Sequence, residues 1–525
     1  MENGLRGTVR GRKCRLGGRS RTRRTAAVLS VLVRLAKLPS HLCTRFRMET
    51  RANHRRLIVA IGLIAVLSTS ALSAQTPARF GSPERYQALA REIFAELIGI
   101  NTTPAGGTGK AAEALAARLR AAGFPEADIH VVGPIPERMN LVARLRGRNT
   151  AKKPVLLLAH LDVVDADPAD WTLDPFAFTD RDGWFYGRGT TDDKDEVAIW
   201  MATLIRMKQE GYVPDRDVII ALTADEETTS ETNGVEWLLA HRRDLVEAAF
   251  ALNEGGGGVI KDGRRLSNNV QASEKVFQSF QLEAINRGGH SSLPRPDNAI
   301  NQLATALGRI ADHRFPVVLN EVTRAFFDRT AALEAPAVAA DMRAVLRNPA
   351  DQAAADRLAA VPAYNARLRT TCVATMLAGG HAENALPQRA RATVNCRILP
   401  GQPPEEVHAT LQRVVNDPGV TITPLNPAKP SPPSPLTPEV MRAVEEATEE
   451  MWPGVPVIPT MSTGATDGLY LRGSGIPVYG VSGVFGDEAD VRAHGQDERI
   501  RHDWFFEGLE FCYRLVKRLT AGEVM

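Results

Sequence analysis

Short apolar runs alternate with amphipathic segments along the chain after residue 80. The apolar runs predict buried strands at Ile129–Val132, Leu141–Leu145, Val155–His160 and Val218–Ala224. Helical periodicity predicts helices at Tyr86–Ile100, Gly109–Ala122 and Asp193–Glu210. Alternating strands and helices are typical of an α/β fold, in which helices cover both faces of a sheet and functional groups follow the strand ends.

The pattern changes near Lys275, where strands with one polar face begin. The predicted order is strand, helix, strand, strand, helix, strand, at Phe277–Ile285, Asn298–Asp312, Thr370–Met376, Ala390–Ile398, Pro404–Val415 and Val420–Pro424. This order predicts an α+β ferredoxin-like domain, here interrupted by an Ala-rich helical stretch at Leu319–Arg369.

The α/β pattern then resumes, with predicted elements at Pro438–Met451, Val455–Pro459, Ile476–Val481 and Asp503–Thr520. We therefore expect a mixed-sheet domain in two parts, 80–274 and 436–525, with the second domain inserted at 275–425.

The first 74 residues look like a leader. Residues 48–74 combine a basic start, the apolar run Leu57–Leu67 and small residues at the end, which is typical of a secretory signal peptide. Residues 1–47 then form a basic extension that we expect to be unstructured, although an organelle transit peptide is an alternative. The apolar run is too short to span a bilayer. We expect a secreted or periplasmic protein without a stable membrane anchor after cleavage.

The charge is divided between this leader and the remainder. Residues 1–56 hold 16 Lys and Arg and two acids, which leaves 48 basic and 59 acidic residues in 57–525. An acidic body argues against nucleic acid as a partner. The body retains Cys372, Cys396 and Cys512, of which one pair can form a disulfide, but the sequence does not select it.

Candidate chemistry falls in clusters at predicted strand ends or in the following loops. These clusters are AHLDVV, GRGTTDDKDE, TADEET, ALNEGGGG and RAHGQDERI, which contain His160, Asp162, Asp192, Glu226, Glu227, Glu254 and His494. Taken singly, each is compatible with an ordinary loop residue or a helix cap. The glycine run after Glu254 is not in register with a dinucleotide-binding motif.

Together the clusters supply two histidines and several carboxylates without a thiolate, a donor set that suits two divalent ions. Such a pair of ions activates a water molecule, and a neighbouring carboxylate can take its proton. At strand spacing, Asp162 could accept a hydrogen bond from the His160 ring and fix its tautomer.

The motifs HLDVV, GRGTTDDK, DEE and HGQDE resemble, in order and approximate spacing, the dinuclear zinc metallopeptidases. This family includes glutamate carboxypeptidase, succinyl-diaminopimelate desuccinylase, aminoacylase and carboxypeptidase S. Trp171, Pro175 and Phe176 before the GRG block make the chain most similar to carboxypeptidase S and secreted N-acyl-amino-acid hydrolases. The resemblance implies a zinc-peptidase catalytic domain with two Zn²⁺ ions, for which Co²⁺ or Mn²⁺ could substitute.

The resemblance also implies roles for single residues. One ion would be bound by His160 and Glu254, the other by Glu227 and His494, with Asp192 as a bridge. Asp162 would orient His160, and Glu226 would act as general base and then acid. Asp195 departs from the family, where Gly often follows the lysine.

The inserted domain resembles the family's lid or dimerisation domain, so a homodimer through it is expected. His290 in RGGHSS would stabilise the oxyanion, and Asn384, Arg397 and Gly464 would bind substrate. A loop histidine that caps Ser291–Ser292 is the alternative for His290.

The predicted function is that of a secreted metallocarboxypeptidase, which cleaves an amide or peptide bond next to a free carboxylate in a small peptide. An N-acyl-amino-acid amidohydrolase, acting on N-acyl amino acids, is the first alternative. A non-catalytic binding protein on the same fold is the second.

Overall fold

The protein is described by a computed structural model for residues 81–228 and 232–522, which belong to one compact unit. The predicted basic extension and signal peptide lie outside these residues. Among the helices of the described ranges, none has the length and apolar character needed to cross a membrane. The division into a two-part catalytic domain and an inserted domain stays a prediction.

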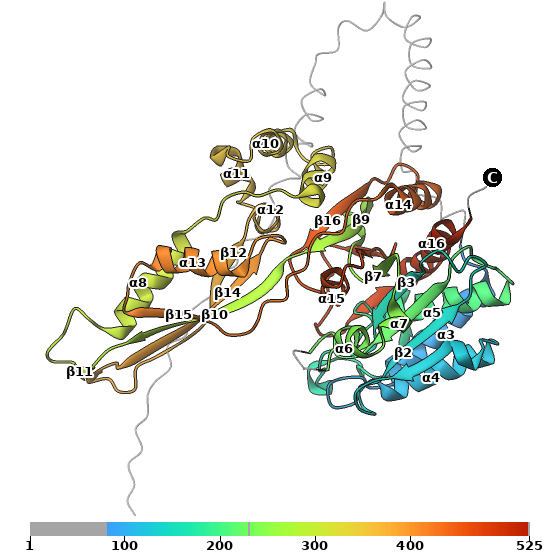
Figure 1. The fold of residues 1–525 in the computed structure, drawn as a ribbon, viewed down its shortest axis with the longest axis horizontal. Coiled ribbons are helices and arrows are strands. Elements are labelled where there is room, and N and C mark those ends of the chain that lie inside the picture. The colour runs from blue at the N-terminus through green and yellow to red at the C-terminus, as the bar shows by residue number, and fades with distance from the viewer. Residues whose placement is uncertain (1–80, 229–231, 523–525) are drawn as a thin grey trace, which may run out of the picture. The chain divides into compact units, whose positions relative to one another are not determined.

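A ten-stranded mixed sheet forms the centre of the α/β part (Figure 1). Its strands follow the order β1 (Ile129–Val132), β2 (Asn140–Leu145), β6 (Val218–Thr223), β3 (Val155–His160), β7 (Phe250–Asn253), β17 (Val478–Gly480), β9 (Arg264–Glu274), β8 (Gly257–Lys261) and β18 (Phe485–Asp487), with β16 (Val457–Ser462) paired to β9. β3 runs parallel to β6 and β7. β17 pairs in parallel with β7, so a strand from late in the chain lies inside the sheet.

Helices cover both faces of this sheet. One face packs against α3 (Glu84–Gly99), α4 (Gly109–Ala121), α5 (Lys194–Gln209), α14 (Pro438–Met451) and α16 (His502–Thr520). The other packs against α6 (Gly234–His241), α7 (Arg243–Val246) and α15 (Gly468–Gly473). Leu157 of β3 faces the first layer and Leu156 the second, which explains why the strand reads as one continuous apolar run.

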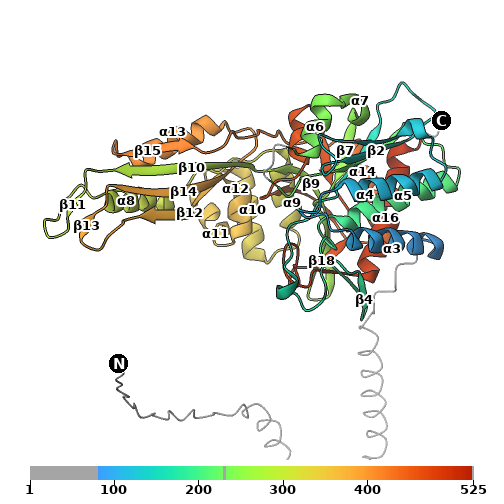
Figure 2. The same cartoon turned by 90° about the horizontal axis from the view of Figure 1, so that it is seen from below.

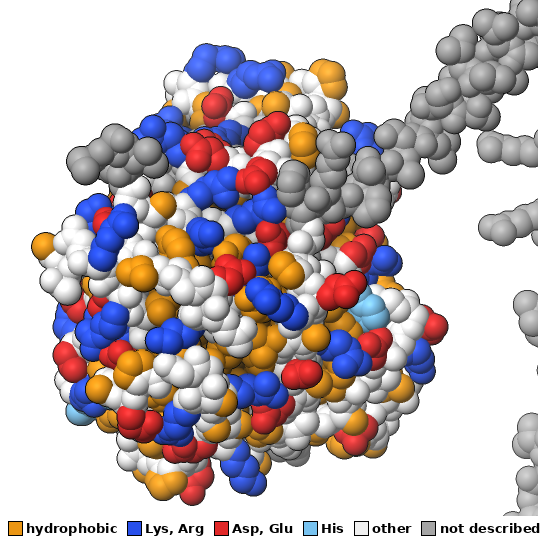
Figure 3. Space-filling view, turned by 90° about the vertical axis from the view of Figure 1, so that its right-hand side faces the viewer, with side chains coloured by type: hydrophobic (Ala, Val, Ile, Leu, Met, Phe, Trp, Pro, Cys, Tyr) orange, Lys and Arg blue, Asp and Glu red, His pale blue; other side chains and the backbone are white. Residues whose placement is uncertain are grey.

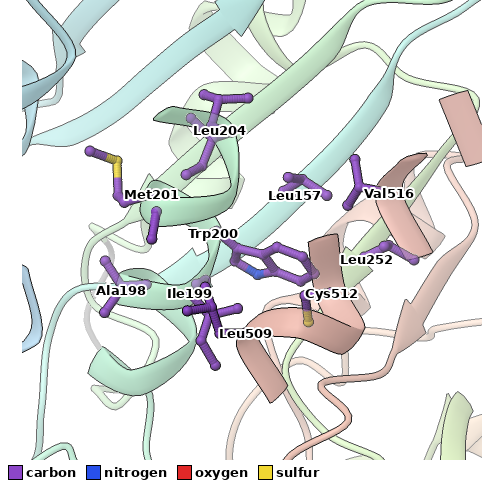
Figure 4. Packing of buried hydrophobic residues seen from close by; sticks show 14 of the residues in the cluster. Leu157, Ala198, Ile199, Trp200, Met201, Leu204, Leu252, Leu509, Cys512 and Val516 are labelled. Carbon is purple, nitrogen blue, oxygen red and sulfur yellow. The ribbon is translucent and has the colours of Figure 1, made fainter. Parts of the chain in front are cut away.

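On the first face, α5 packs against α16 as well as against the sheet. Trp200 of α5 is fully buried and lies beside Leu509 and Cys512 of α16 and Leu157 of β3 (Figure 4). An indole of this size fixes the distance between the two helices and the sheet. The start of α5, which follows Asp192, is thereby held against the sheet edge.

A second, four-stranded antiparallel sheet is formed by the insert (Figures 1 and 2). Its order is β12 (Thr371–Gly379), β14 (Arg389–Ile398), β10 (Val276–Ile285) and β15 (Val420–Pro424), with α8 (Ala299–Asp312) and α13 (Pro404–Val415) packed on one face. This is the strand order of the ferredoxin-like fold that the sequence predicts. A short two-stranded antiparallel ribbon of β11 (Gly289–His290) and β13 (Ala385–Leu386) extends its far end.

A disulfide joins Cys372 of β12 to Cys396 of β14, and Cys512 is buried and free. The two bonded cysteines are register partners in the antiparallel ladder. The structure thus selects the pair that the sequence leaves open.

The Ala-rich stretch at 319–369 is not one long helix but four short ones. They are α9 (Glu321–Thr330), α10 (Pro336–Arg347), α11 (Gln352–Leu358) and α12 (Pro362–Leu368). Proline at the first position of α10 and α12, and an Asp351 side-chain cap on α11, start new helices there. Arg329 of α9 donates 2.7 Å hydrogen bonds to Glu445 and to the backbone oxygen of Val457, which ties this helical group to the large sheet.

A small sheet links the two parts of the α/β region. It contains β4 (Thr179–Arg181), β5 (Trp184–Tyr186) and β19 (Arg499–Arg501). Because β19 pairs with β5, the loop that carries His494 is brought to the turn that carries Asp192. Two 3₁₀ turns, Glu126–Asp128 and Pro168–Asp170, complete the described elements.

The surface carries both signs of charge. On the face seen in Figure 3, Lys and Arg side chains are interspersed with Asp and Glu, and apolar side chains lie between them. A binding site for a polyanion would instead concentrate basic side chains.

Candidate metal centre

The predicted ligands lie at one edge of the large sheet. β3 ends at His160, and its parallel neighbours β6 and β7 lead into Glu226–Glu227 and Glu254. Because the carboxyl ends of parallel strands meet at the same edge, these side chains converge. Asp192 and His494 reach this edge from the loops that the small sheet brings together.

The structure places the five predicted ligands in two overlapping groups. His160, Asp192 and Glu254 form one, and Asp192, Glu227 and His494 form the other; within each group the candidate ligand atoms lie within 4.8 Å of one another. Asp192 belongs to both, with Oδ1 3.0 Å from His160 Nε2 and Oδ2 3.0 Å from His494 Nε2. A carboxylate that divides its oxygens between two groups has the geometry of a bridging ligand.

Glu226 lies beside both groups. Its carboxylate falls within 4.8 Å of ligand atoms of His160 and Glu227, and the side chain is half-buried. Burial raises the pKa of Glu226, and the nearby carboxylates of Asp467 and Glu227 raise it further.

The Asp162 carboxylate does not accept the hydrogen bond from the His160 ring that the strand spacing predicts. His160 Nδ1 lies 3.0 Å from the Asp162 backbone oxygen, whereas the Asp162 carboxylate is 3.7 Å away, too far for a hydrogen bond. The backbone carbonyl can therefore accept the Nδ1–H and leave Nε2 free as a ligand. The carboxylate instead accepts the backbone N–H groups of Glu226 (3.1 Å) and Glu227 (3.0 Å), and so fixes the turn that presents both acids.

Sequence reasoning missed Glu498, which lies within the HGQDE motif. This fully buried carboxylate accepts hydrogen bonds from Arg188 (2.6 Å), from the Gly189 N–H (3.1 Å) and from the Thr191 N–H (2.7 Å) and hydroxyl (2.9 Å). Glu498, four residues after His494 in the chain, thereby stabilises the turn that precedes Asp192. The sequence signal for Glu498 is its position in the same HGQDE motif as the predicted ligand His494.

Asp193 is a second missed residue. It follows Asp192 through a cis peptide bond, and its carboxylate accepts the His160 backbone N–H at 3.0 Å. Burial raises the pKa of Asp193 to about 8. The side chain connects the GRG turn to the end of β3.

The glycine run after Glu254 has a conformational explanation. Gly255, Gly256 and Gly257 all have positive φ, at 91°, 70° and 77°. A Cβ at Gly256 would lie 2.4 Å from the backbone oxygen of Gly480. The run is therefore needed for a tight turn against β17.

Electrostatics at the centre favour bound cations. Burial would raise the pKa of Asp192, but hydrogen bonds with His160 and His494 lower it strongly. The Asp192 hydrogen bond raises the pKa of His494 to about 9. Burial raises the pKa of Glu254, whose Oε1 has no hydrogen-bond partner among the described residues. Nitrogen and oxygen donors gathered around unpaired buried carboxylates fit two divalent ions.

His290 and Asn384, which are predicted to act on the substrate, lie in or beside the paired strands β11 and β13, apart from this centre (Figure 1). His290 and Asn384 are neighbours at the β11–β13 ribbon, where the Ser291 N–H donates to the Asn384 backbone oxygen at 2.9 Å. Ser292 hydrogen-bonds His290 Nδ1 at 2.8 Å, as the alternative interpretation of His290 expects. In the described residues, no hydrogen bond or ion pair joins His290, Asn384 or Arg397 to the five ligand candidates.

Gly464 lies in a loop whose later residues, Thr466 and Asp467, are held by hydrogen bonds. Asp467 accepts hydrogen bonds from Thr223 (2.9 Å) and Asn233 (2.6 Å), which flank the Glu226–Glu227 turn. Glu274, the last residue of β9, accepts the N–H (3.1 Å) and hydroxyl (3.0 Å) of Thr466. The loop is thus connected both to the candidate metal centre and to the point where the chain enters the insert.

Arg397 lies at the base of the insert sheet, opposite Phe277 and Thr371. Its guanidinium is 4.9 Å from the Phe277 ring centre and half-buried, and burial lowers its pKa. Lys275 lies beside it and is fully buried, with Nζ 2.7 Å from the Arg369 backbone oxygen. In the parts of the chain that the structure describes, no carboxylate forms an ion pair with either residue, so this corner carries uncompensated positive charge.

Stability should respond to pH through Lys275. Burial, together with Arg397 and Arg367, lowers the pKa of Lys275 to about 7 in the folded chain, against about 10.4 in an unfolded one. Between these values the unfolded chain binds more protons, so the contribution of Lys275 to stability increases as the pH rises from about 7 to about 10. The melting temperature of the wild type, relative to that of Lys275→Met, should therefore rise over this range in thermal unfolding scans. Exposed Lys110→Met is the control, and a constant difference for Lys275→Met would contradict the expectation.

The fold and the site define a metal-dependent hydrolase, in which an α/β sheet presents histidines and carboxylates at its carboxyl edge. The chain belongs to the peptidase family M20/M25/M40, whose profile matches residues 156–518. This result confirms the resemblance and the hydrolase class inferred from the motifs.

Two relatives illustrate the range of the family. The chain is 30% identical to the N-fatty-acyl-amino acid synthase/hydrolase of Xenopus tropicalis, over 73% of this chain and 75% of the relative. It is 28% identical to the probable carboxypeptidase S-like 2 of Dictyostelium discoideum, over 75% of this chain and 77% of the relative.

Solved structures agree with the fold. The M20 family metallo-carboxypeptidase Sso-CP2 from Sulfolobus solfataricus has a TM-score of 0.60 at 19% identity and covers 82% of this chain and 99% of its own. A dinuclear metal-binding M20 peptidase from Bacillus subtilis has a TM-score of 0.54 at 12% identity, covering 83% and 99%. At these identities the likeness concerns the fold alone, which matches the predicted α/β class.

Proposed function

We propose that the protein hydrolyses an amide bond next to a free carboxylate, in a small peptide or an N-acyl amino acid. The observation that carries this proposal is Arg397, a half-buried guanidinium without a carboxylate partner among the described residues. Its planar pair of N–H donors suits a carboxylate.

The metal centre would consist of two Zn²⁺ ions. His160, Asp192 and Glu254 would hold one, and Asp192, Glu227 and His494 the other, with Co²⁺ or Mn²⁺ as substitutes. When bound, such ions activate a water molecule and polarise a carbonyl. Asp162 keeps Glu226 and Glu227 in place through their backbone N–H groups.

Glu226 would take the proton from the attacking water and pass it to the leaving amine. Its position beside both ligand groups, and a pKa raised by burial, suit an acid–base group that works near neutral pH. Its presence also argues against a non-catalytic binding protein, because loss of this acid alone would be enough to remove activity. His290 would have to approach from the β11–β13 ribbon to act on the oxyanion.

A carboxypeptidase that acts on small peptides is our first assignment. The N-acyl-amino-acid amidohydrolase is the second candidate, favoured by the similarity to the N-fatty-acyl-amino acid synthase/hydrolase of Xenopus tropicalis. Both reactions share the chemistry of the centre and the free carboxylate, and they differ in the acyl group.

Arg397 can be tested with substrates that differ only in the carboxyl end. The wild type should hydrolyse a dipeptide or N-acyl amino acid with a free carboxyl group at least about tenfold faster, in kcat/KM, than its amide, since a charge-assisted pair contributes 1.5–3 kcal/mol. Arg397→Met should remove this preference. Arg391→Met, on the same face of β14 but paired with Glu283, is the matched control. Equal rates on both substrates with the wild type would reject the proposal.

Export to an oxidising compartment would fit two observations. The sequence predicts a signal peptide at 48–74, and Cys372 and Cys396 form a disulfide. Disulfides persist mainly outside the cytosol.

A homodimer would use the insert. β12 lies at the edge of its sheet, and Val373, Met376 and Leu377 on this strand are strongly exposed. An exposed apolar edge strand is prone to pair with another chain.

A further inference from the structure

Two segments of the chain connect the insert to the α/β part. β9 ends at Glu274 and β10 begins at Val276, so the chain passes from the large sheet into the insert sheet over a single residue (Figure 1). It returns through the proline-rich segment between β15 and α14. Arg397 is the register partner of Phe277, near the start of β10. The direction of the chain at these two connections therefore affects where Arg397 lies.

One buried side chain, Arg472 of α15, contacts both connections. Its Nη2 forms an ion pair with Glu274, and its Nε donates a hydrogen bond to the Ser431 hydroxyl at 2.9 Å. All three side chains are buried. Burial raises the pKa of Glu274, and the contact with Arg472 limits this rise. Removal of either partner would leave an uncompensated buried charge, so Arg472 holds the two connections together.

The same network continues to the candidate metal centre. The hydroxyl and the N–H of Thr466 donate to Glu274 at 3.0 and 3.1 Å, and the Asn253 side chain donates to the Thr466 hydroxyl at 3.3 Å. Asn253 and Thr466 are buried as well, and Asn253 directly precedes the ligand candidate Glu254. Hydrogen bonds therefore lead without interruption from the neighbour of a metal ligand to both connections of the insert.

The reaction requires that the two ends of this network keep a fixed relation. The ligand candidates belong to the α/β part, whereas Arg397 belongs to the insert. A substrate bound through its carboxylate must also place its amide bond at the metals, and small errors in such placement are costly. Buried polar networks rigidify the regions that they connect, so this network is suited to maintain the distance.

We infer that Glu274 and Arg472 are positioning residues, which fix the insert and its Arg397 relative to the metal centre. The inference rests on the proposed function, because it takes Arg397 as the residue that binds the substrate carboxylate. Both side chains are buried and act through Arg397 rather than by contact with the substrate.

The kinetic test uses two variants. Glu274→Gln removes the ion pair but keeps an oxygen for Thr466, and Ser431→Ala removes only the hydrogen bond from Arg472. Glu274→Gln should raise KM for a free-carboxyl substrate about tenfold, since a displacement of about 1 Å can cost up to about 10²-fold. Ser431→Ala should raise it by a smaller factor. KM for the corresponding amide and the metal content should keep their wild-type values, because neither depends on Arg397.

A purely structural role would give a different result. Partial unfolding would lower kcat on both substrates equally and leave KM unchanged. Glu510→Gln is the matched control, because Glu510 is also a buried acid paired with an arginine, Arg206, but lies between α5 and α16. This variant should keep the wild-type KM for both substrates.

The position of the insert can also be measured without a substrate. Spin labels at Gln412→Cys of α13 and Ala240→Cys of α6, both exposed positions, report the distance between the insert and the α/β part in a chain whose Cys14 and Cys43 are replaced by serine. In the metal-loaded protein, Glu274→Gln and Ser431→Ala should shift or broaden the distance distribution determined by pulsed electron paramagnetic resonance. Glu510→Gln should leave it unchanged.

The two measurements separate the inference from the proposed function. If the wild type does not prefer the free carboxylate, the proposed function fails, and the distance distribution alone decides whether the network positions the insert. An unchanged distribution in both variants would overturn the inference. Unchanged KM values, in an enzyme whose wild type prefers the free carboxylate, would overturn it as well.

Discussion

Glu226→Gln should lower kcat by about 10²- to 10⁴-fold, the range attributed to general acid–base catalysis, while the protein keeps its metal ions. Glutamine preserves the shape of the side chain but cannot accept the proton of the attacking water. The five ligand candidates are unchanged, and the backbone N–H of residue 226 can still bond to Asp162. The measurements are steady-state kinetics and metal analysis by mass spectrometry on the same preparation.

Two comparisons make this result specific. Glu137→Gln changes an exposed acid and should have wild-type kinetics. Glu226→Gln with nearly full activity would remove Glu226 as the base, whereas loss of metal in this variant would show that Glu226 is a ligand, as its proximity to His160 and Glu227 allows.

Asp192→Asn should have the second largest effect, a loss of metal from both groups. Asp192 is the one residue that belongs to the His160–Glu254 group and to the Glu227–His494 group. An amide carries no charge and cannot bridge two cations with equivalent oxygens. The metal content, determined by metal analysis, should therefore fall from about two ions per chain to less than one, and the activity should fall with it.

Variants confined to one group provide the contrast. Glu254→Gln and His494→Ala should each leave about one ion, because the other group remains complete. Asp244→Asn, an exposed acid paired with Arg242, should keep two. Wild-type metal content in Asp192→Asn would contradict a bridging role. Because bound ligands stabilise the folded state, the melting temperatures should follow the same order as the metal contents.

The sequence predicted a strand and the site residue after it correctly where the neighbouring residues along the chain already indicate burial. Strand β3 is buried on both faces, so it appears as an unbroken apolar run, and His160 at its end stands out. The same holds for β6 and the two acids that follow it. The ends of these parallel strands indicated that His160, Glu226 and Glu227 would lie close together, whereas the roles of the ligands were implied by the family resemblance.

Strand β9 shows why other elements were missed. Its sequence RRLSNNVQASE is mostly polar, yet Asn268 and Glu274 are fully buried. Their partners, Thr448 and Thr466, lie far along the chain. Hydrophobic periodicity cannot detect a strand whose polar groups are satisfied by distant residues.

The same reason explains why the sequence did not reveal Glu498 and Asp467 and gave Asp162 another partner. Glu498 bonds to a turn about 300 residues earlier, and Asp467 bonds to Thr223 and Asn233. Asp162 was assigned to His160 from strand spacing, but a turn placed the two backbone N–H groups of Glu226 and Glu227 closer to it. Such choices between competing partners depend on tertiary geometry.

The position of β17 has a consequence for the order in which the protein can be assembled during synthesis. This strand lies between β7 and β9, and it is followed along the chain by the loop with His494. When the insert sheet emerges from the ribosome, β7 still lacks its neighbour, and the second group of metal ligands is incomplete. The insert can fold on its own strands while the large sheet keeps an open edge. We expect the nascent chain to depend on chaperones during this interval, and metal loading to follow translation of the last hundred residues rather than accompany the folding of the first half.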